Sequence, residues 1–231
     1  MKSIILALLA CMSSIVLSAQ ECVADAGVIA NEDSCSTESI QAAVDACLLL
    51  AEAAESKDTV ALRKAKESME ECNLSDFGLL RAQNRDVNES LEGHMIFNAA
   101  FADSLVSGKD AYKNANEINR SSAHRGQMQP GSILTKTCLV KAKSKSIYKF
   151  VSSDRQELAV VAEPGGLITT RVHAVNKTKG INEWHNDTKD ITKGRNCRKT
   201  AFQLPNAPKS QVTLEITNCT NRDISVVVIS N

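Results

Sequence analysis

The spacing of hydrophobic residues changes near residue 132, and this change divides the chain into two halves. In the first half, apolar residues recur at steps of three and four, which is the spacing of one face of an α-helix. In the second half they recur at steps of two, which is the spacing of one face of a β-strand. The pattern therefore predicts an α+β chain of two modules, an N-terminal helical bundle followed by an antiparallel β-sandwich.

Four helices are predicted in the first half. The first spans 36–56 and starts with serine and threonine, whose hydroxyls can bond the orphan amides of a first turn. The second spans 58–72, a longer third one spans 84–107, and a short fourth one spans 109–119. We expect the helices to share a core of their own. The alternative is an interaction module in which the third helix contacts a partner.

Short alternating segments follow one another through the second half, with glycine, proline and asparagine at the turns between them. A polar stretch, 120–132, is the predicted linker, and 177–196 is polar and irregular with a short strand around Trp184. This many short strands is typical of a sandwich or barrel. The predicted strands are 133–142, 146–152, 157–162, 167–176, 198–204, 211–218 and 224–230.

The strands of the second half also carry a set of motifs that occur in a known family. They are Tyr148-x-Phe150, Glu157-Leu158-x-Val160, Gly166-Leu167 followed by Val172, and Thr213-x-Glu215-x-Thr217-Asn218 before the closing strand 224–230. In these positions, residues 132–231 resemble the bacterial pre-peptidase C-terminal domain. The resemblance implies a secreted, jelly-roll-like β-sandwich in an extracellular or envelope setting. Members of that family are commonly accessory domains, and some bind calcium or polymeric ligands, but no such site maps residue by residue.

The first residues predict a secretory signal peptide, 1–19. Lys2 precedes an apolar run that is shorter than the roughly 20 residues needed to span a bilayer, and small residues end at Ala19. A lipoprotein signal ending at Cys11 is the alternative, and it fits less well because its apolar region would be shorter. We expect a secreted or periplasmic protein that is not an integral membrane protein, with a helical domain over 20–119 and a β-sandwich domain over 133–231.

The cysteines predict disulfides, because an oxidising compartment favours them. Cys197 and Cys219 are centred on residue 208, which lies inside a turn at 205–209, so they should stand almost opposite each other in a hairpin. Two further pairs are expected, Cys47 with Cys72 in the first helical hairpin and Cys22 with Cys35 in the preceding loop. Cys138 is then the odd thiol and can link two chains. No Cys-x-x-Cys pair supports zinc.

The charge and the motif content narrow the classes of function. The chain has 27 Lys and Arg against 27 Asp and Glu, so no net field favours nucleic acid. Gly-x-Ser-x-Gly, His-Glu-x-x-His, the P-loop and Gly-x-Gly-x-x-Gly are all absent, so no catalytic site is predicted. The histidines are scattered along the chain, at His94, His124, His173 and His185.

One polar segment is a candidate for ligand binding. It contains Glu183, Trp184, Asp187 and Asp190. The carboxylate oxygens of the three acidic residues could ligate calcium, and the indole of Trp184 could stack on a sugar ring. The spacing matches no EF-hand loop, and an exposed loop between strands explains the same residues. No cofactor is therefore predicted, and calcium is only a weak alternative.

Six Asn-x-Ser/Thr triplets would be glycan acceptors in a eukaryotic secretory pathway. The signal peptide and the family resemblance favour a bacterium, where the triplets carry no such meaning. Their asparagines are Asn73, Asn88, Asn119, Asn176, Asn186 and Asn218.

Together these observations predict a non-catalytic accessory protein for binding, targeting or adhesion, with an extracellular protein or a glycan as its partner. Two alternatives belong to other classes. One is an envelope structural protein that forms a disulfide-linked dimer through Cys138. The other is an enzyme with a site between the two modules, for which the sequence offers no motif.

Overall fold

The computed structural model describes a helical layer and two β-sheets. The described residues are 36–72, 74–78, 80–83, 90–108, 110, 113, 115–116, 132–152, 156–185 and 198–231. All of them belong to one compact unit, Asp33–Asn231. The predicted signal peptide and nearly all of the predicted linker lie outside the described residues, so both remain predictions. No helix among the described residues is long and apolar enough to cross a membrane.

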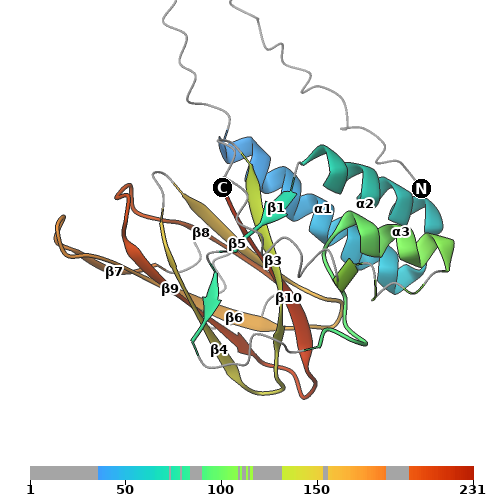
Figure 1. Cartoon of the computed structure of the whole chain (residues 1–231). Helices are drawn as coiled ribbons and strands as arrows, with labels where there is room; N and C mark the ends of the chain where they lie inside the picture. The colour runs from blue at the N-terminus through green and yellow to red at the C-terminus, as the bar shows by residue number, and fades with distance from the viewer. Residues whose placement is uncertain are drawn as a thin grey trace, which may run out of the picture. The chain divides into compact units, whose positions relative to one another are not determined.

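The strands form two five-stranded sheets (Figure 1). Sheet A has the order β1 (Leu74–Asp76), β3 (Ile133–Val140), β10 (Ile224–Ser230), β5 (Glu157–Ala162) and β8 (Lys199–Gln203). Sheet B has the order β2 (Arg81–Ala82), β4 (Lys145–Val151), β9 (Gln211–Asn218), β6 (Ile168–Asn176) and β7 (Ile181–His185). Neighbouring strands are antiparallel except β1 and β3, which are parallel. The predicted β-sandwich is thereby confirmed, and without β1 and β2 the strand order is that of a jelly roll.

The burial of each strand follows its place in the layers. In β9, Val212, Leu214 and Ile216 are buried between the sheets, and the residues that alternate with them are more exposed. In β10, every residue is buried, so no alternation is seen. The difference arises because β10 lies in the middle of sheet A, and both faces of sheet A are covered.

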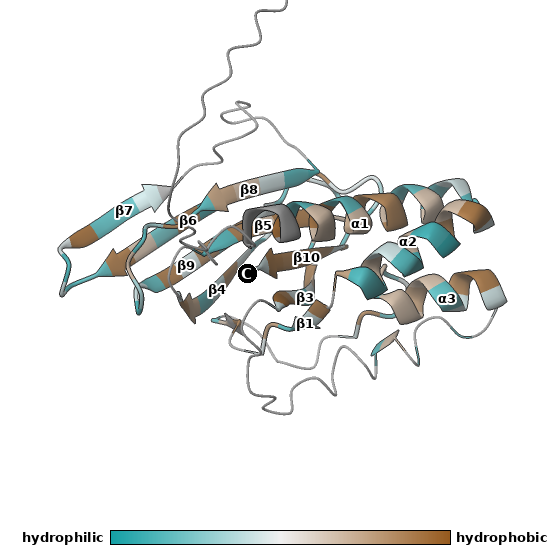
Figure 2. Cartoon of the chain, turned by 90° about the horizontal axis from the view of Figure 1, so that it is seen from above, coloured by the Kyte–Doolittle hydropathy of each residue, from teal (hydrophilic) through white to brown (hydrophobic). Residues whose placement is uncertain are grey.

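The helices cover the outer face of sheet A (Figures 1 and 2). They are α1 (Ser36–Ser56), α2 (Thr59–Glu71) and α3 (Ala99–Ser107). One core joins their apolar residues to the outward residues of sheet A, Ile133, Leu139, Ala159, Val161, Val227 and Ile229. A second core fills the space between the two sheets. Within the described part of the chain the order of layers is therefore helices, sheet A, sheet B.

The predicted N-terminal helical bundle is wrong. Only three helices occur among the described residues, and they bury their apolar residues against sheet A as well as against one another. After α2 the chain leaves the helical layer. It adds β1 to the edge of sheet A and β2 to the edge of sheet B before it reaches α3. The helical half therefore does not hold a separate core of its own.

The predicted third helix, 84–107, is helical only from Ala99 onward among its described residues. Asn98 begins it, since its Oδ1 accepts a hydrogen bond from the Phe101 N–H at 2.8 Å. Before that point the backbone is held by the sandwich, where the Phe97 N–H donates to Thr137 Oγ1 at 3.1 Å. Most of the predicted fourth helix, 109–119, lies outside the described residues.

The structure forms no disulfide among the described cysteines. Cys47 and Cys72 are both free thiols beneath the helices, so this structure does not form the disulfide predicted between them. Cys22, Cys35 and Cys197 lie outside the described residues, and the two pairs that involve them remain predictions. Cys138 packs against the core between the sheets.

Candidate functional site

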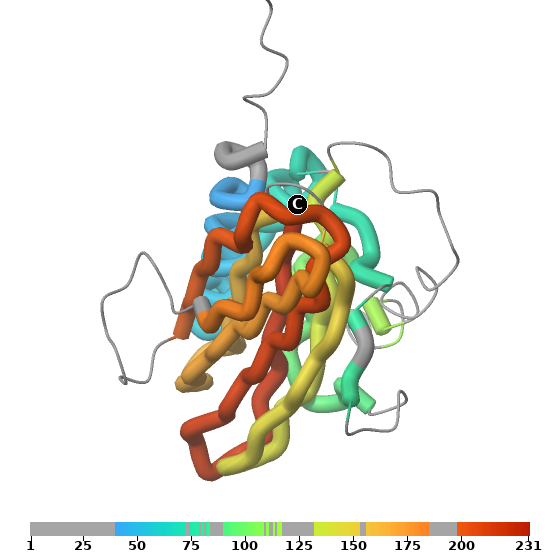
Figure 3. The backbone as a smooth tube through the Cα atoms, turned by 90° about the vertical axis from the view of Figure 1, so that its left-hand side faces the viewer, coloured from blue at the N-terminus to red at the C-terminus, as the bar shows by residue number. Residues whose placement is uncertain are grey.

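The outer face of sheet B is the candidate functional site. Helices cover the outer face of sheet A, whereas no helix of the described residues lies over the outer face of sheet B (Figure 3). The side chains that point outward from its strands are half-buried or exposed. This face is therefore accessible to a ligand over the width of four strands.

The strand register arranges the outward side chains in rows, because residues directly opposite each other in antiparallel strands share a face. One row crosses the sheet from β4 to β7 and consists of Lys149, Thr213, His173 and Trp184. The row beside it consists of Ile147, Glu215 and Arg171. Residues that are far apart in sequence thus form one continuous surface, which we call the open face.

Trp184 is the most exposed aromatic residue of the open face, at 47 %. The imidazole of His173 stacks on the indole with 4.4 Å between ring centroids and 10° between planes. The guanidinium carbon of Arg171 lies 4.3 Å from the indole centroid, which is a cation–π contact. His173 is held in turn, since its Nε2 donates to Asn182 Oδ1 at 2.7 Å. The indole is therefore exposed and also fixed in position before any ligand arrives.

Of the four residues predicted as a ligand loop, two are described, and both lie on β7 rather than in a loop. Glu183 is paired with Ala174, whose side chain is buried on the inner side of the sheet, so Glu183 points away from the open face. Trp184 points onto the open face with His173. Asp187 and Asp190 lie outside the described residues.

The sequence prediction missed Arg171 and His173. Both lie on β6, on the other arm of the hairpin that turns at residues 177–180. A signal for them exists in the sequence. Folding the chain about that polar turn, which contains Gly180 with φ +67°, places residue 173 opposite residue 184.

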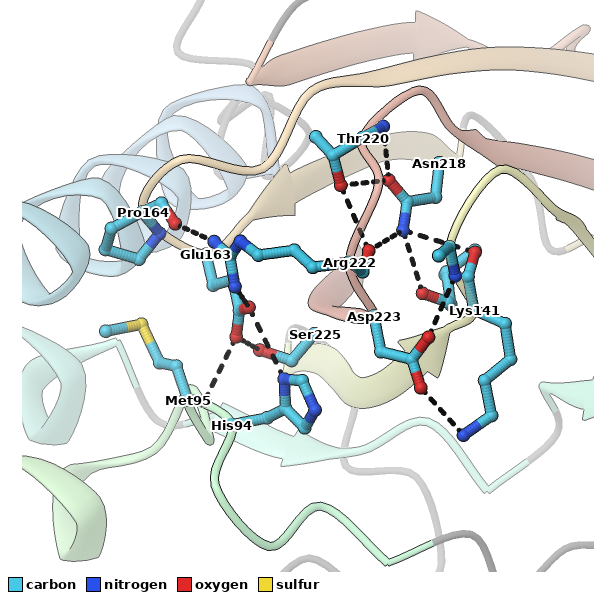
Figure 4. A network of polar contacts seen from close by, with 12 residues as sticks. His94, Met95, Lys141, Glu163, Pro164, Asn218, Thr220, Arg222, Asp223 and Ser225 are labelled. Atoms are coloured by element: carbon cyan, nitrogen blue, oxygen red, sulfur yellow. Dashed lines mark hydrogen bonds and ion pairs between the residues drawn. The ribbon is translucent and has the colours of Figure 1, made fainter.

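A second polar cluster surrounds Glu163, at the end of β5 (Figure 4). Its side chain is only 6 % exposed. The carboxylate accepts hydrogen bonds from the Met95 N–H at 3.2 Å, from Ser225 Oγ at 2.7 Å and from an Arg222 nitrogen at 2.7 Å. His94 Nδ1 lies 3.4 Å from the same carboxylate. Since protein groups already occupy both oxygens, this cluster ties the segment 90–98 to the sandwich and offers no site for a substrate.

The turn that follows β9 is fixed beside this cluster (Figure 4). Asn218 is fully buried, and its Nδ2 donates to the carbonyl oxygens of Val140, Lys141 and Arg222. The Asp223 carboxylate accepts from Lys141 Nζ at 2.9 Å and from a backbone N–H at 2.9 Å. These bonds hold the pKa of Asp223 below its ordinary value.

The asparagines of two Asn-x-Ser/Thr triplets, Asn218 and Asn176, are buried and make hydrogen bonds within the fold. Asn218 uses its amide nitrogen for the three bonds just described. Asn176 is also buried, and its Nδ2 donates to Pro208 O at 3.1 Å and Ser210 Oγ at 3.3 Å. Neither amide can carry a glycan in the folded protein, because each would have to leave its buried partners.

The described residues hold no group of three or more His, Cys, Asp or Glu side chains placed to bind a metal. The two histidines with described partners contact Glu163 and Asn182, respectively. His124 and the side chain of His185 lie outside the described residues.

No family model matches the chain, so the resemblance to the pre-peptidase C-terminal domain is not confirmed. No curated protein matches it either. Among solved structures, the mitogen of Yersinia pseudotuberculosis is 17 % identical over 43 % of this chain and 85 % of its own, with a TM-score of 0.30.

Two other solved structures show a similarly weak likeness. The periplasmic inhibitor of g-type lysozyme, PliG, from Salmonella Typhimurium is 11 % identical over 46 % of this chain and 93 % of its own, with a TM-score of 0.28. The CBM22-1 xylan-binding domain of Paenibacillus barcinonensis Xyn10C is 12 % identical over 46 % of this chain and 76 % of its own, with a TM-score of 0.25. Likenesses of this degree support no conclusion about function.

Proposed function

We propose that this chain is a non-catalytic binding protein that holds a glycan on the open face of sheet B. The observation that carries the proposal is the state of Trp184, which is half exposed yet fixed by Arg171 and His173. An exposed aromatic side chain that is already ordered loses little entropy on binding, so its contact energy goes into affinity.

The residues around the indole suit a sugar. Thr213 and Asn182 lie on the same face and bring a hydroxyl and an amide, which can bond the hydroxyl groups of a saccharide. Thr213 sits in the row that ends at Trp184. The arrangement provides one apolar contact for a sugar ring and polar contacts for its hydroxyl groups.

We also propose a secreted or periplasmic location, which the predicted signal peptide favours. Glycan polymers are accessible in those compartments. The location is part of the proposal and rests on the pattern of residues 1–19.

Affinity electrophoresis of the full mature chain tests the proposal. The polymers are xylan, dextran, polygalacturonate, dextran sulfate and soluble peptidoglycan fragments. Because Trp184 is the single tryptophan of the chain, its fluorescence emission reports a ligand at this site directly. At least one polymer is expected to retard the protein and to shift the emission.

Trp184→Ala is expected to weaken that retardation about tenfold or more, a loss of about 1.4 kcal/mol. Val60→Ala is the matched control, since Val60 is an exposed apolar residue of α2, in the helical layer. It should bind as the wild type does. The proposal is wrong if no polymer changes the emission, or if the Trp184 variant is retarded as strongly as the wild type.

A further inference from the structure

The described residues of the open face carry more positive than negative charge. Lys145, Lys149 and Arg171 point outward from it, and Glu215 lies among them. Glu215 forms an ion pair with Lys145 at 3.0 Å, and its side chain is only 16 % exposed. This pair is close to neutral, so Lys149 and Arg171, which are exposed and form no ion pair with a described residue, set the charge of the face.

This excess of positive charge is local. The whole chain has 27 basic and 27 acidic residues, so the molecule has no net charge that would attract anions from a distance. Salt screens exposed charges beyond about 8 Å at physiological ionic strength. Lys149 and Arg171 therefore act on anionic groups that touch the open face.

The two cations lie on different strands of the face. Lys149 is on β4 and Trp184 is on β7, and three strand spacings of 4.7–4.9 Å separate these strands, about 14 Å in all. Arg171 is on β6, beside the indole. A ligand that contacts both Trp184 and Lys149 must be longer than one monosaccharide and must cross the strands.

We infer, building on the proposed function, that the glycan is an acidic polysaccharide. One of its sugar rings lies against Trp184, and its carboxylate or sulfate groups lie against Arg171 and Lys149. The guanidinium carbon of Arg171 lies over the indole, and the N–H donors of a guanidinium form a planar fork that can bind an oxyanion in a bidentate manner. Lys149 acts as a point charge at the other end of the row.

Two pairs of polymers test this inference, each with one backbone in a charged and a neutral form. They are polygalacturonate with its full methyl ester, and dextran sulfate with dextran. Binding of the full mature chain is followed by Trp184 emission and by affinity electrophoresis at about 0.15 M NaCl. The protein is expected to bind at least one acidic polymer about tenfold or more tightly than its neutral form, and added salt should weaken this binding.

The variants separate a specific contact from general attraction. Lys149→Gln with Arg171→Gln should weaken binding of the acidic polymer about tenfold more than binding of its neutral form, which depends on Arg171 only through the position of the indole. Arg171→Lys, with Lys149 intact, should lose less because the charge remains. The double variant Arg63→Gln with Lys64→Gln removes the same charge from the exposed side of α2, and it should bind as the wild type does.

The outcomes separate failure of this inference from failure of the proposed function. If the neutral polymers bind as tightly as the acidic ones and still shift the emission, the inference fails and the proposed function stands. If no polymer shifts the emission, the proposed function fails with it. If the α2 variant loses as much affinity as the Lys149 and Arg171 variant, the attraction is unspecific and the inference fails. Tighter binding of an oligo-dT strand than of either acidic polymer would replace the glycan by a nucleic acid.

Discussion

Replacing Glu163 with alanine tests whether one buried carboxylate anchors the segment 90–98 to the sandwich. In the native protein this carboxylate accepts hydrogen bonds from the Met95 N–H, from Ser225 Oγ and from Arg222. Met95 and Ser225 are buried. Alanine removes the acceptor and leaves both donors where water has little access.

The expected cost can be worked out from these three donors. Met95 and Ser225 each lose a charged acceptor, and an unsatisfied buried group costs about 1–3 kcal/mol. The side chain of Arg222 is 51 % exposed, so it can regain water and should add little. We expect Glu163→Ala to lower the free energy of unfolding by about 3–5 kcal/mol. Glu163→Gln keeps the shape and one acceptor oxygen, and it should cost about 1–3 kcal/mol.

Urea unfolding followed by circular dichroism measures both losses. Glu215→Ala is the control, because it removes a carboxylate whose lysine partner is half exposed and should cost no more than about 1 kcal/mol. A loss for Glu163→Ala no greater than that of Glu215→Ala would refute the reasoning. It would mean that the segment 90–98 is held by its apolar contacts and that the carboxylate contributes nothing net.

Three further predictions concern other parts of the fold. The Asp223 pKa is lowered, chiefly by the hydrogen bond from Lys141, so its contribution to stability is present above its ordinary pKa of 3.8 and is lost as the pH falls through the lowered value. Asp223→Asn should therefore destabilise the protein near pH 7, and the gap to the wild type in urea unfolding should narrow toward pH 2; a constant gap would contradict this. Burial, and next the negative charge of Cys72, raises the pKa of the Cys47 thiol, so in reduced native protein Cys47 should alkylate far more slowly than Cys72, as peptide mass spectrometry would show. Equal labelling rates would argue against the buried position. A methyl group on Gly166 would lie 2.9 Å from the Glu163 carbonyl oxygen, so Gly166→Ala should lower the thermal midpoint and cost about 1–3 kcal/mol. Gly180→Ala, with no atom in its way, should cost about 1 kcal/mol from its positive φ, and an equal or larger loss there would refute the steric argument.

The strands could be predicted from the sequence because their signal is local. In β9, buried and outward residues alternate over the whole strand, and the strand lies between two turns. β10 lacks that alternation, but its run of apolar and small residues is itself typical of a strand covered on both faces. In contrast, β1 and β2 have three and two residues, which is too short for any period to be detected.

The third helix was mispredicted because its partners are distant in sequence. Leu91 and Met95 have helical spacing, yet both are buried in a segment that is not helical. The backbone there bonds to Glu163 and Thr137, about which the sequence of residues 84–107 contains no information. Tertiary contacts therefore override the local period.

Of the candidate site, the sequence alone indicates one residue, whereas the others depend on how distant strands pair. Trp184 could be singled out from the sequence as the one tryptophan of the chain. Its neighbours Arg171 and His173 depend on the pairing of β6 with β7, which only the register defines. Lys149 requires two further pairings, β4 with β9 and β9 with β6. The cationic part of the open face was therefore beyond reach until the sheet order was known.

The placement of the helical layer explains why the outer face of sheet B stays open. Sheet A needs both faces covered, because β10 is apolar on both sides. Sheet B has polar outward positions on β9, such as Thr213 and Thr217, and can face water without a cover. The Glu163 carboxylate holds the segment before α3 against sheet A, and so keeps this cover on one side of the molecule. The helical layer and the open face thus lie on opposite faces of the sandwich, so substitutions on one should act additively with substitutions on the other.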